Sequence, residues 1–383
     1  EPKYRSHAIR PGKPRLEGLP ATYAESDAEA STLEITLEDE PSGLSVVLCY
    51  TAFESFPAVA RSARIVCGER PVTLTRALSL ALDFPDSAYT MLQLSGSWAR
   101  ERHIHTRPLV PGIQAIDSTR GSSGHMQNPF MALSGPCAGE DHGEVYGFSL
   151  VYSGSFYAGV EVDQFGSARA LMGINPFGFS WRLGPGEAFQ TPEAVMVYSE
   201  RGLQGMSHSY HELYRTRLCR GRHRDRPRPV LVNNWEATYF DFNEEKLLAI
   251  AERAQAVGAE LFVLDDGWFG RRDSDTCSLG DWTVDERKLP GGLSGLAAKI
   301  NALGLDFGLW VEPEMVSADS DLYREHPDWC LHAPGRRRTE ARNQLVLDLS
   351  RAEVCERLEA DLSRVFSSAP VRYVKWDMNH NMT

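Results

Sequence analysis

The sequence has 383 residues, of which 42% are hydrophobic and 24% are charged, a composition that supports a large packed core and two domains. Asp and Glu number 52 against 40 Lys and Arg, so the formal net charge is −12. Proteins that bind nucleic acids or anionic membranes usually present a basic face, and the acidic balance argues against both classes. The arginine clusters at 220–228 and 336–338 are interpreted as solvated loops.

The ends and the cysteines of the chain bear on its cellular setting. No run approaches the roughly 18 to 20 apolar residues that a membrane-spanning helix needs, so no membrane association is predicted. The chain begins at Glu1 without an initiator Met or a secretion signal, and we expect that it starts inside a longer protein. Its seven cysteines are scattered and include no CxxC pair, which favours reduced thiols in a cytoplasmic protein over a disulfide framework or a zinc site.

The first half of the chain has the pattern of short antiparallel strands. Alternating residues at 33–39 and an apolar run at 44–50 flank a Pro-Ser-Gly turn, which predicts a β-hairpin. Runs of the same kind, separated by Gly, Pro, Asn and Asp, recur at 64–67, 77–83, 145–152, 158–163 and 194–198. This spacing predicts an antiparallel sandwich or barrel. A helix is predicted over 202–219, followed by a Pro-rich linker at 226–229.

The second half alternates strands with helices, which predicts a parallel sheet. One helix is predicted by Asn243 as an N-cap and by apolar residues at helical spacing, Leu247, Ile250, Ala251 and Ala254. A second is predicted by Leu293, Leu296, Ala297 and Ile300, with Gly304 as a stop, and a third by a capping box of Ser350 and Glu353. The predicted strands are 230–235, 261–266, 306–311, 344–348 and 373–377. This order fits a doubly wound sheet or a (β/α)8 barrel, and no strand is followed by a glycine-rich phosphate loop. A closed barrel needs roughly 250 residues, so 228–383 would form only its first half.

Polar and aromatic residues follow four of the predicted strands at their C-terminal ends. They are Trp235; Asp265 and Asp266; Trp310 and Glu312; and Lys375, Asp377 and Asn379. Each alone has an ordinary structural explanation as a turn, core or ion-pair residue. In a parallel barrel, however, all these ends share the face that carries active sites. The repeated placement therefore predicts a functional site there.

The residue types at this face favour a neutral sugar as the ligand. Tryptophan faces pack on the C–H surfaces of a pyranose, and carboxylates, Lys and Arg342 are expected to hydrogen-bond its hydroxyls. Glycoside hydrolysis uses paired carboxylates, and Lys375 two residues before Asp377 would favour an ionised nucleophile. A divalent-metal site of Asp265, Asp266 and Glu312 is an open alternative. No GxSxG or HExxH motif occurs at these turns.

Several longer motifs also occur together. They are NNWEATYFDF, LFVLDDGWFG, GDWTVDERKLPGGL, LWVEPEMVS, ARNQLVLDLS and VKWDMNHNMT, preceded by GKPRLEGLPATYAE and STRGSSGHMQNPF. They closely resemble microbial α-galactosidases of glycoside hydrolase family 36. The resemblance implies an antiparallel β-supersandwich with a terminal helix over 1–220, followed by the first half of a catalytic (β/α)8 TIM barrel over 228–383.

The resemblance also implies an activity. It implies a retaining hydrolase that releases terminal α-linked galactose from sugars such as melibiose or raffinose, through a covalent galactosyl-enzyme and without a metal or organic cofactor. The nucleophile of the family motif corresponds to Asp377. The residues implied to bind galactose or line its site are Trp235, Asp265, Asp266, Trp310, Arg342, Lys375 and Asn379. A homo-oligomer, such as a tetramer, is implied for the complete enzyme.

Two departures from the family accompany this expectation. His380 stands where the family usually has Arg, and the family's general acid/base lies in a segment beyond Thr383. Glu312 and Glu314 are interpreted as supporting residues, so the 383 residues alone are predicted to be inactive. The alternatives are an α-N-acetylgalactosaminidase or an α-galactosyl-transferring enzyme of the same fold, and a catalytically silent sugar-binding protein.

Overall fold

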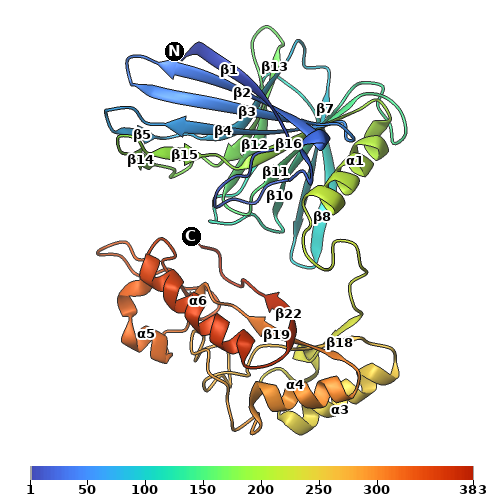
Figure 1. Cartoon of the computed structure of the whole chain (residues 1–383), viewed down its shortest axis with the longest axis vertical. Helices are drawn as coiled ribbons and strands as arrows, with labels where there is room; N and C mark the ends of the chain where they lie inside the picture. Colours follow the sequence, from blue (N-terminus) through green and yellow to red (C-terminus); the bar gives the residue numbers. More distant parts are fainter. Residues whose placement is uncertain (1, 383) are drawn as a thin grey trace. The chain divides into compact units, whose positions relative to one another are not determined.

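The computed structural model describes residues 2–382 and divides the chain into two compact units, Glu1–Asp225 and Arg226–Thr383. Figure 1 shows strands throughout the first unit and a mixture of strands and helices in the second. Among residues 2–382, no helix is both long enough and apolar enough to cross a membrane.

The first unit is built from antiparallel sheets. The largest has ten strands in the order β1-β2-β3-β4-β16-β11-β10-β7-β8, with β15 paired to β4; a second has the order β6-β13-β12-β9, and β14 pairs with β5. The predicted hairpin is confirmed as β2 and β3, with Gly43 at φ 71° in its turn. The strand bounds are β1 Lys3–Pro11, β2 Ala30–Asp39, β3 Leu44–Phe53, β4 Ala58–Val66, β5 Val72–Leu74, β6 Leu78–Phe84, β7 Thr90–Ser97, β8 Arg100–Pro108, β9 Gly112–Asp117, β10 Gln127–Ser134, β11 Val145–Val151, β12 Phe156–Val162, β13 Ala168–Ile174, β14 Trp181–Leu183, β15 Ala188–Gln190 and β16 Glu193–Ser199.

The core of this unit lies between the ten-stranded and four-stranded sheets. Phe148 of β11, Phe156 of β12 and Met172 of β13 have no exposed surface and belong to one apolar cluster. Helix α1 (Gly202–Arg217) packs on β11 and β16, and its Tyr210 hydroxyl donates to the Val195 carbonyl at 2.8 Å. The helix approaches closely because β11 has a glycine beneath it: a Cβ on Gly147 would lie 2.7 Å from the Tyr210 ring.

The second unit contains a parallel sheet of four strands in the order β17-β18-β19-β22, as the strand–helix alternation predicts. Their bounds are β17 Leu231–Asn233, β18 Leu261–Leu264, β19 Asp306–Val311 and β22 Val371–Trp376. The helices of this unit are α2 Trp235–Thr238, α3 Glu244–Ala256, α4 Gly292–Ala302, α5 Asp321–Glu325 and α6 Ala352–Ser367, with a short 3-10 turn at Pro327–Trp329. The first unit has a similar turn at Asp27–Glu29.

Apolar helix faces cover this sheet. Leu247 and Ala251 of α3, with Leu296 and Ile300 of α4, have no exposed surface and pack in one cluster with the strands. The predicted N-cap is confirmed, because the Asn243 side chain accepts from Lys246 N at 2.9 Å. The periodicity therefore placed the buried faces of both helices correctly.

Two local predictions for this unit are wrong. The predicted strand at 344–348 is only β21 (Leu345–Val346), which pairs antiparallel with β20 (Met315–Val316) outside the parallel sheet. The predicted capping box does not form either. The Ser350 hydroxyl donates to Asp348 at 2.6 Å, and α6 has Arg351 at its N-cap without a side-chain cap.

Candidate active site

The four parallel strands bring their carboxyl ends to one edge of the sheet, where the predicted site residues lie. Asp265 and Asp266 follow β18 directly, Trp310 lies in β19, and Lys375 lies in β22 with Asp377 just after it. Trp235 does not end a strand as predicted, because β17 stops at Asn233 and Trp235 is the first residue of α2. Its ring packs edge-on against Tyr239 and Phe240, at centroid distances of 5.2 and 5.0 Å.

Asp265 is a buried carboxylate with a partly exposed partner. Lys375 Nζ lies 2.7 Å from its Oδ2, and the side chains are 37% and 3% exposed for Lys375 and Asp265 respectively. The Asn233 amide also donates to Oδ2, and the backbone N of Asp266 donates to Oδ1 at 2.8 Å. The lysine ammonium thus reaches from the buried acid toward the open side of the site.

Asp266 is held by a different cation. Arg272 donates from Nε to Oδ1 at 2.9 Å and from Nη2 to Oδ2 at 2.8 Å, in a bidentate pair. The Arg272 side chain is 1% exposed, and its guanidinium lies over the Phe240 and Phe269 rings. Burial raises the pKa of Asp266, and Arg272 opposes that rise. Each carboxylate oxygen keeps acceptor capacity for a hydroxyl.

Asp377 is surrounded by N–H donors. Trp310 Nε1 and Asn379 Nδ2 donate to its Oδ2 at 3.0 and 2.9 Å, and Met378 N donates to Oδ1 at 3.0 Å. Its own backbone N donates to the Val311 carbonyl at 2.9 Å, which continues the β19–β22 ladder past Trp376. These contacts hold the carboxylate in one orientation at the end of the strand.

Trp310 enters the site differently from the expectation that it lines a sugar with its face. The residue is 2% exposed, and its ring stacks on Phe269 with an interplanar angle of 3°. Trp268 Nε1 donates to the Trp310 carbonyl at 3.0 Å and fixes its backbone. What Trp310 offers is therefore the N–H edge that holds Asp377.

Arg342 and Asn379 meet although they lie on different segments. Arg342 Nη1 donates to Asn379 Oδ1 at 3.0 Å. Arg342 has φ 51° and Asn343 has φ 58°, so both central residues of this tight turn adopt the left-handed region. Such a turn projects the Arg342 side chain away from the short β20–β21 ladder, toward the segment that follows β22.

The open alternative of a divalent-metal site does not fit the donor set. Asp265 and Asp266 are paired with the cations Lys375 and Arg272, and Glu312 accepts from amide N–H groups. Within residues 2–382, no group of three or more His, Cys, Asp and Glu side chains is arranged to hold a metal ion. His380 is 4% exposed, and its ring contacts the Asn381 carbonyl.

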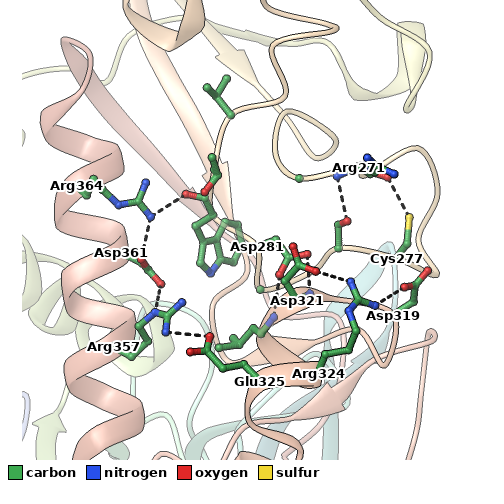
Figure 2. Close-up of a pocket in the computed structure, with 17 residues that line it drawn as sticks. Arg271, Cys277, Asp281, Asp319, Asp321, Arg324, Glu325, Arg357, Asp361 and Arg364 are labelled. Atoms are coloured by element: carbon green, nitrogen blue, oxygen red, sulfur yellow. Dashed lines mark hydrogen bonds and ion pairs between the residues drawn. The ribbon is translucent and has the colours of Figure 1, made fainter.

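A charged cavity of about 800 Å³ also lies in this unit, and none of the predicted site residues lines it. Figure 2 shows that its lining comes from the loop after β18, from α5 and from α6. Arg357 and Arg364 both pair with Asp361, while Arg324 pairs with Asp319 and Asp321. Arg364 also donates to the Trp282 carbonyl at 3.2 Å. These ion pairs thus lie within α6 and within residues 319–324, and the Arg364 hydrogen bond joins the loop to α6.

Three site residues were missed in the sequence: Asn233, Arg272 and Gln344. Asn233 had a signal, because an amide at a strand end next to buried carboxylates is a natural donor. Arg272 had none, since it lies in an aperiodic loop six residues after Asp266. Gln344 was assigned to a strand, whereas its side chain donates to Glu312 at 2.9 Å.

Comparison with known families places the chain. Residues 188–383 match the Melibiase family model, and residues 1–184 match the glycosyl hydrolase family 36 N-terminal domain. The chain belongs to the Melibiase family. The resemblance inferred from the motifs is therefore confirmed.

Curated relatives are similar in sequence to the whole chain. Alpha-galactosidase AgaA of Geobacillus stearothermophilus is 63% identical over 383 residues, which is 100% of this chain and 52% of the relative. Alpha-galactosidase Mel36A of Lactobacillus acidophilus is 47% identical, over 99% of this chain and 52% of the relative. The chain thus spans about half the length of the curated relatives it matches.

Solved structures show the same fold. The crystal structure of the family 36 α-galactosidase AgaB from Geobacillus stearothermophilus superposes with a TM-score of 0.99 at 62% identity, over 100% of this chain and 53% of that one. A substituted AgaA in complex with raffinose gives a TM-score of 0.98 at 62% identity, over 100% of this chain and 54% of that one. The predicted fold class, a family 36 β-sandwich followed by part of a (β/α)8 barrel, is confirmed.

Proposed function

We propose that the protein containing this chain is a retaining α-galactosidase that releases terminal α-linked galactose from raffinose-type sugars. The relatives that match the whole chain are named alpha-galactosidases, and structures of AgaA hold raffinose and stachyose. The observation that carries the proposal is the environment of Asp377. Its carboxylate is oriented by Trp310 and Asn379 at a strand end, two residues from the partly exposed Lys375.

Asp377 acts as the nucleophile in this proposal. One carboxylate oxygen attacks the anomeric carbon of galactose, a new C–O ester bond forms, and the bond to the leaving-group oxygen breaks as that oxygen takes a proton. Water then attacks the same carbon, loses a proton, and releases galactose and the Asp377 carboxylate. Two inversions leave the product in the α configuration. The predicted location of the proton donor outside residues 1–383 stays a prediction.

The other predicted residues recognise the sugar. Lys375 and Arg342 donate hydrogen bonds to hydroxyl oxygens, while Asp265 and Asp266 accept hydrogen bonds from hydroxyl groups. Asn379 can accept a hydrogen bond from a hydroxyl through the second lone pair of Oδ1, because Arg342 uses only one and both N–H groups are engaged by Asp377 and Glu312. Trp235 offers the aromatic surface that the buried Trp310 does not.

The stereochemistry of hydrolysis tests the proposal. The full-length protein containing this chain is incubated with p-nitrophenyl α-galactoside, and the anomer released first is followed by proton NMR. We expect α-galactose first, and galactose release from raffinose. Initial release of β-galactose would refute the retaining mechanism, and no hydrolysis of either substrate would refute the activity.

A further inference from the structure

One fully buried carboxylate contacts two segments that carry predicted sugar-site residues, the turn of Arg342 and the segment after β22. Glu312, the first residue after β19, has no exposed surface. Its Oε1 accepts from the backbone N of Asn379. Its Oε2 accepts from Asn379 Nδ2 at 3.2 Å and from Gln344 Nε2 at 2.9 Å. Three donor atoms from two distant segments thus meet at one side chain.

The contacts of Glu312 determine how Asn379 can be oriented. With the backbone N and side-chain Nδ2 of Asn379 both directed to one carboxylate, the amide cannot flip without placing its oxygen against Glu312. In the observed orientation Nδ2 also reaches Asp377 Oδ2 at 2.9 Å, and Oδ1 faces Arg342. A flip would exchange these roles and set Asn379 Oδ1 against the Asp377 carboxylate.

We infer that Glu312 is a positioning residue of the active site: its buried carboxylate holds Asn379 in the orientation from which the amide supports Asp377. The inference rests on the proposed function for its effect on rate, while the contacts themselves do not depend on it. Glu312 touches neither the nucleophile nor the open side of the site. It acts through Asn379, and through Gln344 it also steadies the turn that carries Arg342.

The chain offers a matched control two residues further on. Glu314 is also a largely buried glutamate, and burial raises the pKa of both carboxyl groups. Its Oε1 accepts from Trp376 Nε1 at 2.8 Å. None of its described side-chain contacts involves Asn379, Gln344 or Asp377. A change at Glu314 therefore shows how much kcat and stability change when a largely buried glutamate on this loop is altered without affecting Asn379.

The substitution Glu312→Gln keeps the shape of the side chain and removes one acceptor. Whichever way the new amide turns, its NH₂ group faces an N–H donor, either the backbone N of Asn379 or the pair of amides on the other side. A displacement of about 1 Å near the chemistry can cost about 10²-fold in rate. In the full-length protein we expect kcat on p-nitrophenyl α-galactoside to fall about 10²-fold, with KM changed less than about threefold, whereas Glu314→Gln changes kcat less than about threefold.

A double-mutant cycle distinguishes positioning from a general structural role. If Glu312 acts through Asn379, the variant Glu312→Gln/Asn379→Ala is no slower than Asn379→Ala alone. Multiplicative losses in kcat would overturn the inference, and so would an unchanged kcat in Glu312→Gln. Melting temperatures of Glu312→Gln and Glu314→Gln are measured beside kcat, so that turnover is compared only under conditions in which both variants are folded.

Hydrogen exchange provides a readout that needs no activity. The backbone N of Asn379 donates to Glu312, so its exchange should be about tenfold faster in Glu312→Gln or Glu312→Ala than in Glu314→Gln. Unchanged exchange in peptides covering 377–382 would overturn the inference whatever the reaction is. Faster exchange in a protein that does not hydrolyse α-galactosides would instead refute the proposed function and leave the positioning role supported.

Discussion

The two units bury charge in different ways. In the sandwich unit, Lys13 and Glu193 pair with side chains 3% and 2% exposed, and Thr22 donates to the same carboxylate from its backbone N and its hydroxyl. In the parallel-sheet unit, Asp265 is as deeply buried, but its partner Lys375 is 37% exposed. Both members of the first pair are buried, whereas the second pair has a partly exposed cation on β22, the edge strand of its sheet.

This difference separates two uses of a buried carboxylate. A closed pair ties segments together, here the start of the chain and β16, and its loss leaves an uncompensated charge in the core. An open pair keeps hydrogen-bonding capacity for a substrate. Removing a charge from the first should therefore reduce stability, and removing one from the second should reduce turnover.

The largest effect should come from the nucleophile itself. In the full-length protein, Asp377→Ala should lower kcat on an aryl α-galactoside by about 10³-fold or more, because no other group forms the glycosyl ester. External azide should restore part of the turnover by attacking the same carbon. A variant that keeps more than about a tenth of the wild-type rate would contradict the assignment.

A large stability effect is expected in the sandwich unit. Glu193→Gln leaves the Lys13 ammonium buried without a counter-charge and should lower the free energy of unfolding by about 3–5 kcal/mol. Urea unfolding of the full-length protein measures this, with the exposed Glu187→Gln as the control. Folded Glu193→Gln protein should keep its kcat. A loss of kcat without a loss of stability would contradict the conclusion that the Lys13–Glu193 pair serves stability and not turnover.

An intermediate effect on turnover is expected at Asp265. Asp265→Asn removes a charged acceptor from a desolvated site and should cost about 2–4 kcal/mol in kcat/KM. It should also relax the discrimination between galactose and glucose. The exposed Asp241, which pairs with Lys246, provides the control substitution Asp241→Asn. A galactose complex with Asp265 more than about 4 Å from every hydroxyl would refute its binding role.

The smallest effect is expected for an exposed pair. The hydrogen bond from Arg169 lowers the pKa of Asp83, but the side chains are 55% and 66% exposed, so solvent screening limits the pair to less than about 1 kcal/mol. Because the folded pKa is depressed, this stabilisation is present above the unfolded Asp pKa of about 4 and is lost as pH falls through the folded value. The melting temperatures of wild type and Asp83→Asn should differ slightly at pH 7, and the difference should shrink as the pH falls below about 4. A larger difference at pH 3 would contradict this sign.

Much of the fold could be predicted because its signals are local. The alternation at 33–39 determined one strand of the first hairpin, and the helical spacing of Leu247 and Ala251 determined the buried face of α3. The prediction failed at 344–350, where apolar residues form a two-residue ladder and a turn. A short apolar run has the same composition in a sheet strand and in a packed loop. The two can be told apart only when the segment that pairs with the run is known.

The candidate site shows the same division between local and distant information. By itself, the sequence determined that acids, a lysine and a tryptophan lie at or just after the C-terminal ends of strands, and parallel strands necessarily end at one edge. Only the tertiary structure decided which donor faces which oxygen: Arg272 on Asp266, Trp310 by its edge on Asp377, and Glu312 on Asn379. The last two contacts join residues 67 positions apart, and no local periodicity encodes such a pairing. It arises when packing brings the loops after β19 and β22 together and leaves their buried polar groups one way to be satisfied.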